Sequence, residues 1–303
     1  MELSEAVRPH WRDYYELCKP RVVWLMMLTA VVGMLLASPG FVPWEALVFG
    51  NIGIALCAGS AAAINHVVDQ RIDAVMARTR NRPVAQGRVG TLQAVVFAAV
   101  IGAAGMAVLL VLVNPLTAWL TLASLLGYAL IYTYFLKRAT PQNIVIGGLA
   151  GAAPPLLGWT SVTGEVHPWA LLLVLIIFAW TPPHFWALAI HRKEEYAKVE
   201  IPMLPVTHGD RYTALHILLY TLILFAVTLM PFASGMSSYL YLAGAVVLGA
   251  VFLYWAVQVM IGKNPRAPME TFKYSIVYLM ALFLVMLIDH YLFPRPLAIV
   301  VGG

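Results

Sequence analysis

Nine long apolar runs take up most of this chain of 303 residues. A run of about 20 apolar residues can cross the hydrocarbon core of a bilayer as a helix, and lipid offers the backbone groups no other hydrogen-bonding partners. The runs do not alternate as the strands of a closed barrel do. We therefore predict an all-α, polytopic membrane protein with a single domain over residues 1–303. The predicted spans lie near residues 22–38, 44–66, 92–113, 116–135, 143–160, 168–190, 213–233, 238–261 and 272–293.

The distribution of basic residues tests this number of spans. Only 11% of the residues are charged, and 61% are hydrophobic. With nine spans, 18 of the 19 lysines and arginines fall on one side of the membrane, and only Arg295 falls on the other. Because Lys and Arg collect in cytoplasmic loops, we predict a cytoplasmic amino terminus and an outer carboxyl terminus. The same bias explains the net charge of +5, so we predict no nucleic-acid partner. The first 20 residues lack the pattern of a removable signal peptide.

Two long polar connections follow the second and the sixth predicted spans, both on the cytoplasmic side. Each has about 20 residues, whereas outer connections such as residues 38–43 are very short. Long polar loops on a rigid scaffold are common places for binding and catalysis. We therefore expect the functional site at these two connections. Their separation by four spans suggests a duplicated four-helix unit.

The second span ends in an acidic ladder formed by Asn65, Asp69 and Asp73. A spacing of four residues places all three side chains on one stripe of a helix. Two carboxylates at this spacing repel each other, so we expect a cation to face them. Two carboxylates and an amide oxygen suit Mg²⁺, which also binds substrate phosphates. The alternative is a solvated helix end with Arg71 and Arg78 as counter-ions.

Three arginines, Arg78, Arg80 and Arg82, alternate directly after the ladder. Guanidinium groups bind phosphate through paired hydrogen bonds. Beside a magnesium site, the segment predicts a diphosphate held jointly by the metal and by arginine; the alternative is ordinary cytoplasmic charge bias. Lys137 and Arg138, at the end of the fourth span, either bind the same anion or anchor the helix at the membrane surface.

The sixth span holds a second group of polar residues. Pro182 and Pro183 are expected to break or kink the helix, and His184 follows them directly. His184, His191 and Glu195 are spaced seven and four residues apart, which places them on one face. His184 is a candidate axial ligand, proton carrier or substrate contact, or a hydrogen-bond donor that stabilises the kink. His66, beside the ladder, is a lesser candidate.

These motifs resemble the UbiA superfamily of intramembrane prenyltransferases over nearly the whole chain, from Lys19 to the ninth span. The run from Asn65 to Asp73 matches the superfamily's first metal–diphosphate motif. The superfamily's second motif is often a pair of aspartates, and here only Glu194, Glu195 and Glu200 are found. The branch that acts on haem is indicated by Tyr132-Thr133-Tyr134 with Lys137-Arg138, by Gly147–Trp159, by Pro183-His184-Phe185, by Glu195-Tyr196 and by Ile201–Pro205.

The resemblance implies transfer of a farnesyl group from farnesyl diphosphate to a vinyl group of haem b, giving haem O and diphosphate. It implies nine helices around a central cavity in the cell (inner) membrane, with the active-site loops on the cytoplasmic side. It further implies the lipid bilayer, and a downstream haem A synthase or terminal oxidase, as partners. The implied roles are Mg²⁺ on Asn65, Asp69, Asp73 and Glu195, diphosphate on Arg78, Arg80, Arg82, Lys137 and Arg138, and haem beside His184, His66 and His191, with Asn65, Asp69, Asp73 and His184 as the catalytic residues.

Three alternatives remain open at the level of sequence. The nearest is a prenyltransferase of the same fold that acts on another aromatic or quinone acceptor, since the ladder does not distinguish acceptors. A transporter would also place polar residues within its spans, although here they gather at one membrane face. The third is a non-catalytic assembly subunit of a respiratory complex.

Overall fold

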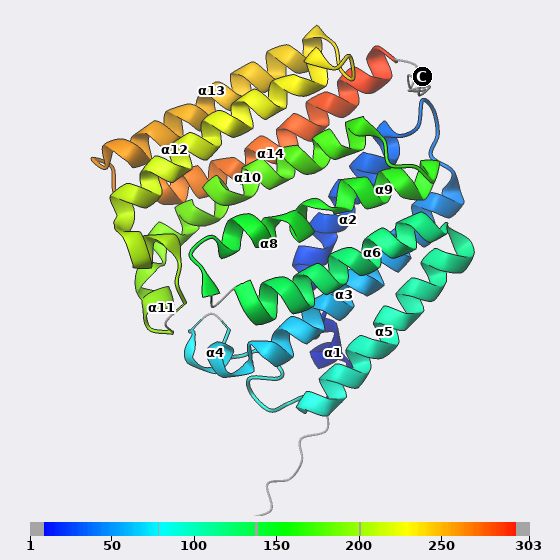
Figure 1. The fold of residues 1–303 in the computed structure, drawn as a ribbon, viewed down its shortest axis with the longest axis vertical. Coiled ribbons are helices and arrows are strands. Elements are labelled where there is room, and N and C mark those ends of the chain that lie inside the picture. Colours follow the sequence, from blue (N-terminus) through cyan, green and yellow to red (C-terminus); the bar gives the residue numbers. More distant parts are fainter. Residues whose placement is uncertain (1–8, 78, 137–138, 200, 295–303) are drawn as a thin grey trace, which may run out of the picture.

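The computed structural model describes residues 9–77, 79–136, 139–199 and 201–294. All regular elements in these residues are helical, as the apolar runs predict (Figure 1). The elements are α1 (Trp11–Leu17), α2 (Pro20–Leu36), η1 (Ala46–Gly50, π-helical), α3 (Asn51–Val68), α4 (Gln70–Val75), α5 (Thr91–Leu112), α6 (Pro115–Leu126), η2 (Gly127–Leu136, π-helical), α8 (Asn143–Ala152), α9 (Pro154–Thr163), α10 (Pro168–His191), α11 (Lys193–Ala197), α12 (Leu204–Ala233), α13 (Tyr239–Ile261) and α14 (Ala267–Leu292).

The membrane-spanning helices agree closely with the predicted runs. Among the described residues, eight helical segments are long and apolar enough to cross a bilayer. A ninth is obtained if α1 and α2, which meet at an angle of 52°, form one span. The seventh helix begins at Leu204 instead of near residue 213, because the helix extends through a polar stretch that hydropathy assigns to a loop. Gly209, with φ 83° and ψ 170°, interrupts this extension.

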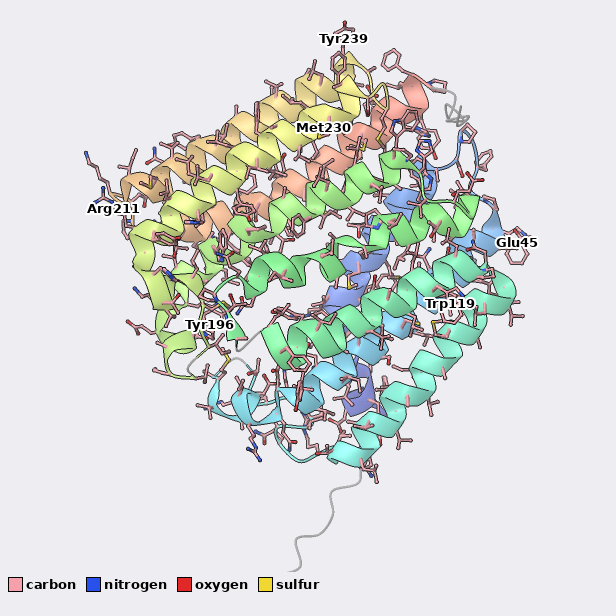
Figure 2. The ribbon with its side chains drawn as sticks, viewed as in Figure 1. Glu45, Trp119, Tyr196, Arg211, Met230 and Tyr239 are labelled. Carbon is pink, nitrogen blue, oxygen red and sulfur yellow. The ribbon has the colours of Figure 1, made fainter. Side chains whose placement is uncertain are left out.

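The long helices lie roughly side by side along one common direction (Figure 1). α2 packs on α9, α3 on α5, and α10 on both α12 and α14. The labelled side chains Tyr196 and Arg211 lie at one end of the helices, and Glu45 and Tyr239 lie at the other (Figure 2). α4 and α11, from the two long connections, lie at the same end as α1 (Figure 1). The two connections therefore share one end of the molecule; that this end is cytoplasmic stays a prediction.

Glycines allow the close approach of α2 and α9. A Cβ built on Gly158 of α9 would lie 1.9 Å from the carbonyl oxygen of Ala30 in α2, and one on Gly33 of α2 would lie 2.0 Å from that of Pro155. Backbone therefore meets backbone at both points, as small residues in membrane helices permit. In the sixth span, by contrast, the two central prolines do not break the helix, since α10 runs without interruption from Pro168 to His191; the alternative of a kink stays a prediction.

The two long connections also share a hydrophobic cluster. Met76 from the first connection belongs to the same cluster of buried side chains as Tyr196, Ile201 and Met203 from the second. Trp186 of α10, which is fully buried, belongs to the same cluster. Burying these apolar groups together holds the first connection against the second.

Candidate active site

The acidic ladder lies where α3 gives way to α4. The main-chain N–H of Asp69 donates to the Asn65 carbonyl at 3.0 Å, and that of Asp73 donates to the Asp69 carbonyl at 2.8 Å. Helical hydrogen bonding thus continues across the boundary at Asp69, which keeps the three side chains on one stripe. Asn65, Asp69 and Asp73 are only 4%, 1% and 3% exposed. This burial argues against the alternative of a solvated helix end.

Groups from three other segments meet the ladder. Arg82 Nη1 lies 2.6 Å from Asp73 Oδ2, and Lys19 Nζ donates a hydrogen bond to Asn65 Oδ1. Asn65 Nδ2 lies 2.9 Å from Asp69 Oδ2 and 3.4 Å from Thr133 Oγ1 of η2. Lys19 and Arg82 therefore place positive charge directly beside the ladder.

Sequence reasoning did not select Lys19 or Thr133 as site residues. Lys19 is the only residue other than glycine with a positive φ in the described part of the chain, at φ 50° and ψ 59°. This left-handed conformation costs a residue with a Cβ about 1–2 kcal/mol. The surrounding fold must supply that energy, which aims the Lys19 side chain at the ladder. A lysine at the start of an apolar run gives no signal that distinguishes it from an ordinary membrane anchor.

The predicted diphosphate-binding residues divide into three groups. Arg82 lies in the site, with its side chain 21% exposed. Arg80 is exposed, and no ion pair of its guanidinium is found among the described residues. Arg78, Lys137 and Arg138 lie outside the described residues. The structure therefore brings Arg82 to the ladder and leaves Arg80 facing outward.

The structure separates His184 from His191 by environment. His184 is 8% exposed, and its ring stacks on Trp180 at 4.2 Å and on Phe272 at 4.6 Å. His184 Nδ1 lies 2.7 Å from Ser275 Oγ, so the ring joins α10 to α14. His191 is exposed, although it lies on the same helical face.

Two further candidates have buried polar atoms without hydrogen bonds among the described residues. His66 is 2% exposed, and neither of its ring nitrogens has a hydrogen-bond partner. It lies within electrostatic range of Lys19 and Arg82. One carboxylate oxygen of Glu195 is also buried and makes no hydrogen bond. Both residues therefore keep polar atoms that a ligand would satisfy.

Tyr132 connects the ladder to the second long connection. Its ring stacks on Tyr128 with a centroid distance of 5.5 Å. Tyr132 lies within electrostatic range of both Asp69 and Tyr196. Thr133, the next residue, donates to the Tyr128 carbonyl at 2.8 Å within the wide turn of η2. Widened turns of this kind are frequent at functional sites.

The ladder has the donor chemistry that Mg²⁺ requires. It offers an amide oxygen and two carboxylates, and Mg²⁺ binds through a few such oxygens while substrate phosphates and water complete its shell. No group of three His, Cys, Asp or Glu side chains in the described ranges is placed to hold a metal. Glu195 therefore forms no such group with Asp69 and Asp73, and a metal on the three ladder residues stays a prediction.

Comparisons with known proteins identify the family to which the chain is similar. The model of the UbiA prenyltransferase family matches residues 26–288. A Saccharophagus degradans protein named protoheme IX farnesyltransferase is 71% identical over 94% of both chains. A Marinobacter nauticus protein of the same name is 70% identical over 93% of this chain and 94% of its own.

Solved structures share the fold at low sequence identity. One, from work on digeranylgeranylglyceryl phosphate synthase, has a TM-score of 0.80 at 16% identity, covering 93% of this chain and 98% of its own. A UbiA homologue from Archaeoglobus fulgidus bound to GPP and Mg²⁺ has a TM-score of 0.60 at 14% identity, covering 90% of this chain and 99% of its own. The match of the family model over residues 26–288, together with the identity of 71% to the Saccharophagus degradans protein, shows that the chain belongs to the UbiA prenyltransferase family.

Proposed function

We propose that this chain transfers the farnesyl group of farnesyl diphosphate to a vinyl group of haem b, giving haem O and diphosphate. The observation that supports this most is its identity of 71% to a protein named protoheme IX farnesyltransferase. The similarity to proteins of this name covers nearly the whole length of both chains. It therefore favours haem as the acceptor over a quinone or another aromatic compound. The buried ladder, faced by Lys19 and Arg82, supplies the chemistry that any prenyl diphosphate donor needs.

The first chemical demand is to stabilise the diphosphate as its bond to the allylic carbon breaks. Mg²⁺ held by Asn65, Asp69 and Asp73 would act as a Lewis acid on that leaving group. Arg82 binds Asp73 through one N–H, which leaves other donors of the guanidinium for phosphate oxygens. Each 1.36 kcal/mol of stabilisation gained selectively in the transition state raises the rate about tenfold.

The second demand is to keep water away until the new carbon–carbon bond forms. The ladder is at most 4% exposed, and the farnesyl chain would lie among apolar helices beneath it. The vinyl π electrons attack the allylic carbon as its bond to oxygen breaks. Water then adds to the resulting cation and releases a proton, which leaves a hydroxyl group on the product.

The residues proposed for haem are His184, His66 and His191, and those for the diphosphate are Arg78, Arg80, Arg82, Lys137 and Arg138. His66 and His184 are both buried, and they belong to different helices, α3 and α10. We place the protein in the cell (inner) membrane, with both long connections on the cytoplasmic side. Support comes from the basic residues gathered at that end, and a haem A synthase or terminal oxidase would consume the product.

The test is product analysis with purified protein in proteoliposomes. Farnesyl diphosphate, haem b and Mg²⁺ are supplied together, and the extracted pigment is analysed by mass spectrometry. We expect haem O from the wild-type protein and none after addition of EDTA. A parallel incubation replaces haem with 4-hydroxybenzoate as a quinone precursor. Prenylation of that acceptor without prenylation of haem would overturn the haem assignment while leaving the family unchanged.

A further inference from the structure

Lys19 lies at the bend between two helices and is fixed from both sides. α1 and α2 meet there at 52°, and Lys19 has the left-handed backbone conformation noted above. On the α1 side, Arg88 forms ion pairs with Asp13 and Glu16, which tie the short helix to the first long connection. On the α2 side, Gly33 packs against the backbone of α9. The bend is therefore held in place by contacts distant from the site.

The Lys19 ammonium contacts Asn65, the uncharged member of the ladder. It donates to Asn65 Oδ1, while Asn65 Nδ2 donates to Asp69 at 2.9 Å. These two contacts fix which way the Asn65 amide faces. They also place a positive charge on the oxygen that we assign to the metal. A metal cation bound to Asn65 Oδ1 would be repelled by the Lys19 ammonium, whereas both positive groups attract a diphosphate.

We propose that Lys19 binds the diphosphate of the prenyl donor and couples metal binding to donor binding. This inference rests on the proposed function. Without donor, the ammonium occupies Asn65 Oδ1 and weakens the affinity of the ladder for a divalent cation. With donor, it bonds to a phosphate oxygen, so the ladder accepts the metal together with the diphosphate. The strained backbone at Lys19 keeps the ammonium within reach of Asn65 Oδ1 and of a diphosphate bound at the ladder.

Removal of the Lys19 charge has opposite effects on the two ligands under this proposal. In Lys19→Met, we expect Mn²⁺ to bind the donor-free protein at least about threefold more tightly, because a repelling and competing charge is gone. We expect the Kd of farnesyl diphosphate, measured with Mg²⁺ and without haem, to rise about tenfold, which corresponds to about 1.4 kcal/mol. A lysine that merely stabilises the fold would weaken both.

The measurements are electron paramagnetic resonance for free Mn²⁺ and equilibrium binding of labelled farnesyl diphosphate. Lys19→Asn also removes the charge, and asparagine tolerates the left-handed backbone, so it tests the charge without added strain. Lys19→Arg should restore most of the donor affinity. Arg21→Met is the matched control, because Arg21 is an exposed cation two residues further along the same chain segment; both constants should stay within about twofold of wild type.

Two results would overturn the proposal. One is an unchanged Kd for farnesyl diphosphate in both charge-removing variants, and the other is weaker binding of Mn²⁺ together with weaker binding of the donor. Haem O formation by the wild-type protein is measured in parallel. If no haem O forms but the two opposite shifts appear, the acceptor assignment fails and the role of Lys19 stands.

Discussion

Substitution of Gly158 by alanine tests whether the contact of α2 with α9 positions the site. The new Cβ would lie 1.9 Å from the Ala30 carbonyl oxygen, 2.7 Å from its carbon and 3.0 Å from its Cα. Ordinary van der Waals contact begins near 3.4 Å, so the oxygen and the Cβ must separate by about 1.5 Å, the difference between 3.4 and 1.9 Å. Neither partner is the end of a flexible side chain, so the helices themselves must move apart.

The magnitude follows from two opposing effects. Overpacking a tight core contact costs about 1–3 kcal/mol, and a backbone-to-backbone contact lies at the upper end because no rotamer change relieves it. Replacing glycine by alanine inside a helix returns about 1 kcal/mol. We expect a net loss of about 2 kcal/mol in stability and a fall of about 5 °C in the thermal unfolding midpoint. Donor affinity should fall too, since α2 begins directly after Lys19.

The assay is thermal unfolding in detergent, followed with a thiol-reactive dye in a Cys18→Ser background, because Cys18 is partly exposed in the fold whereas Cys57 is only 1% exposed and reacts on unfolding. Gly151→Ala is the matched control, because nothing lies within 4 Å of a Cβ at that position and the helix gains propensity. Gly33→Ala, whose Cβ would meet the Pro155 oxygen at 2.0 Å, should repeat the loss from the opposite helix. A midpoint for Gly158→Ala at or above that of Gly151→Ala would refute the reasoning.

Three further predictions concern the site. Asp69→Ala should abolish Mg²⁺-dependent turnover measured as haem O, and substantial activity in EDTA would contradict a metal on the ladder. Arg82→Gln leaves Asp73 buried without its ion pair, and loss of one partner of a buried pair typically costs about 3–5 kcal/mol. Both the thermal unfolding midpoint and kcat/KM should therefore fall, and kcat/KM should fall more than about tenfold. The control Arg71→Gln, at an exposed position, should match wild type in both measurements. His184→Phe preserves an aromatic ring between Trp180 and Phe272 but removes the ring nitrogens. We expect the variant to be folded by size-exclusion chromatography and its turnover to be lowered about tenfold or more. Unchanged turnover would limit the role of His184 to packing.

The membrane spans could be predicted from sequence because apolar run length and basic loops act locally. The predicted span near residues 92–113 compares with Thr91–Leu112, and that near 238–261 with Tyr239–Ile261. The exceptions need tertiary information. Hydropathy does not show that α12 begins at Leu204, with a break at Gly209, because the stretch before residue 213 is polar. It likewise does not show that a short helix, α1, precedes α2 and meets it at an angle of 52° just before the first predicted span.

The ladder was predictable for a similar reason, whereas its partners were not. A spacing of four residues forms a stripe wherever helical hydrogen bonds persist, and they persist from Asn65 through Asp73. Lys19 and Thr133 reach Asn65 from 46 and 68 residues away in the chain. Such pairings depend on how the helices pack, so they cannot be predicted from the local spacing of residues. Three arginines of similar sequence context likewise gave no means of selecting Arg82 over Arg80.

The small residues of the fifth span act on the site through η2. A Cβ on Gly147 would lie 2.1 Å from the Tyr132 ring. The Tyr132 ring can therefore occupy its position only because residue 147 has no side chain. Thr133 follows Tyr132 directly and lies 3.4 Å from Asn65 Nδ2. Displacing the ring would shift the turn that holds Thr133, and the Asn65 amide would lose one of the contacts that orient it. The conformation of Asn65 on α3 therefore depends on the absence of a side chain on α8, with η2 as the physical link.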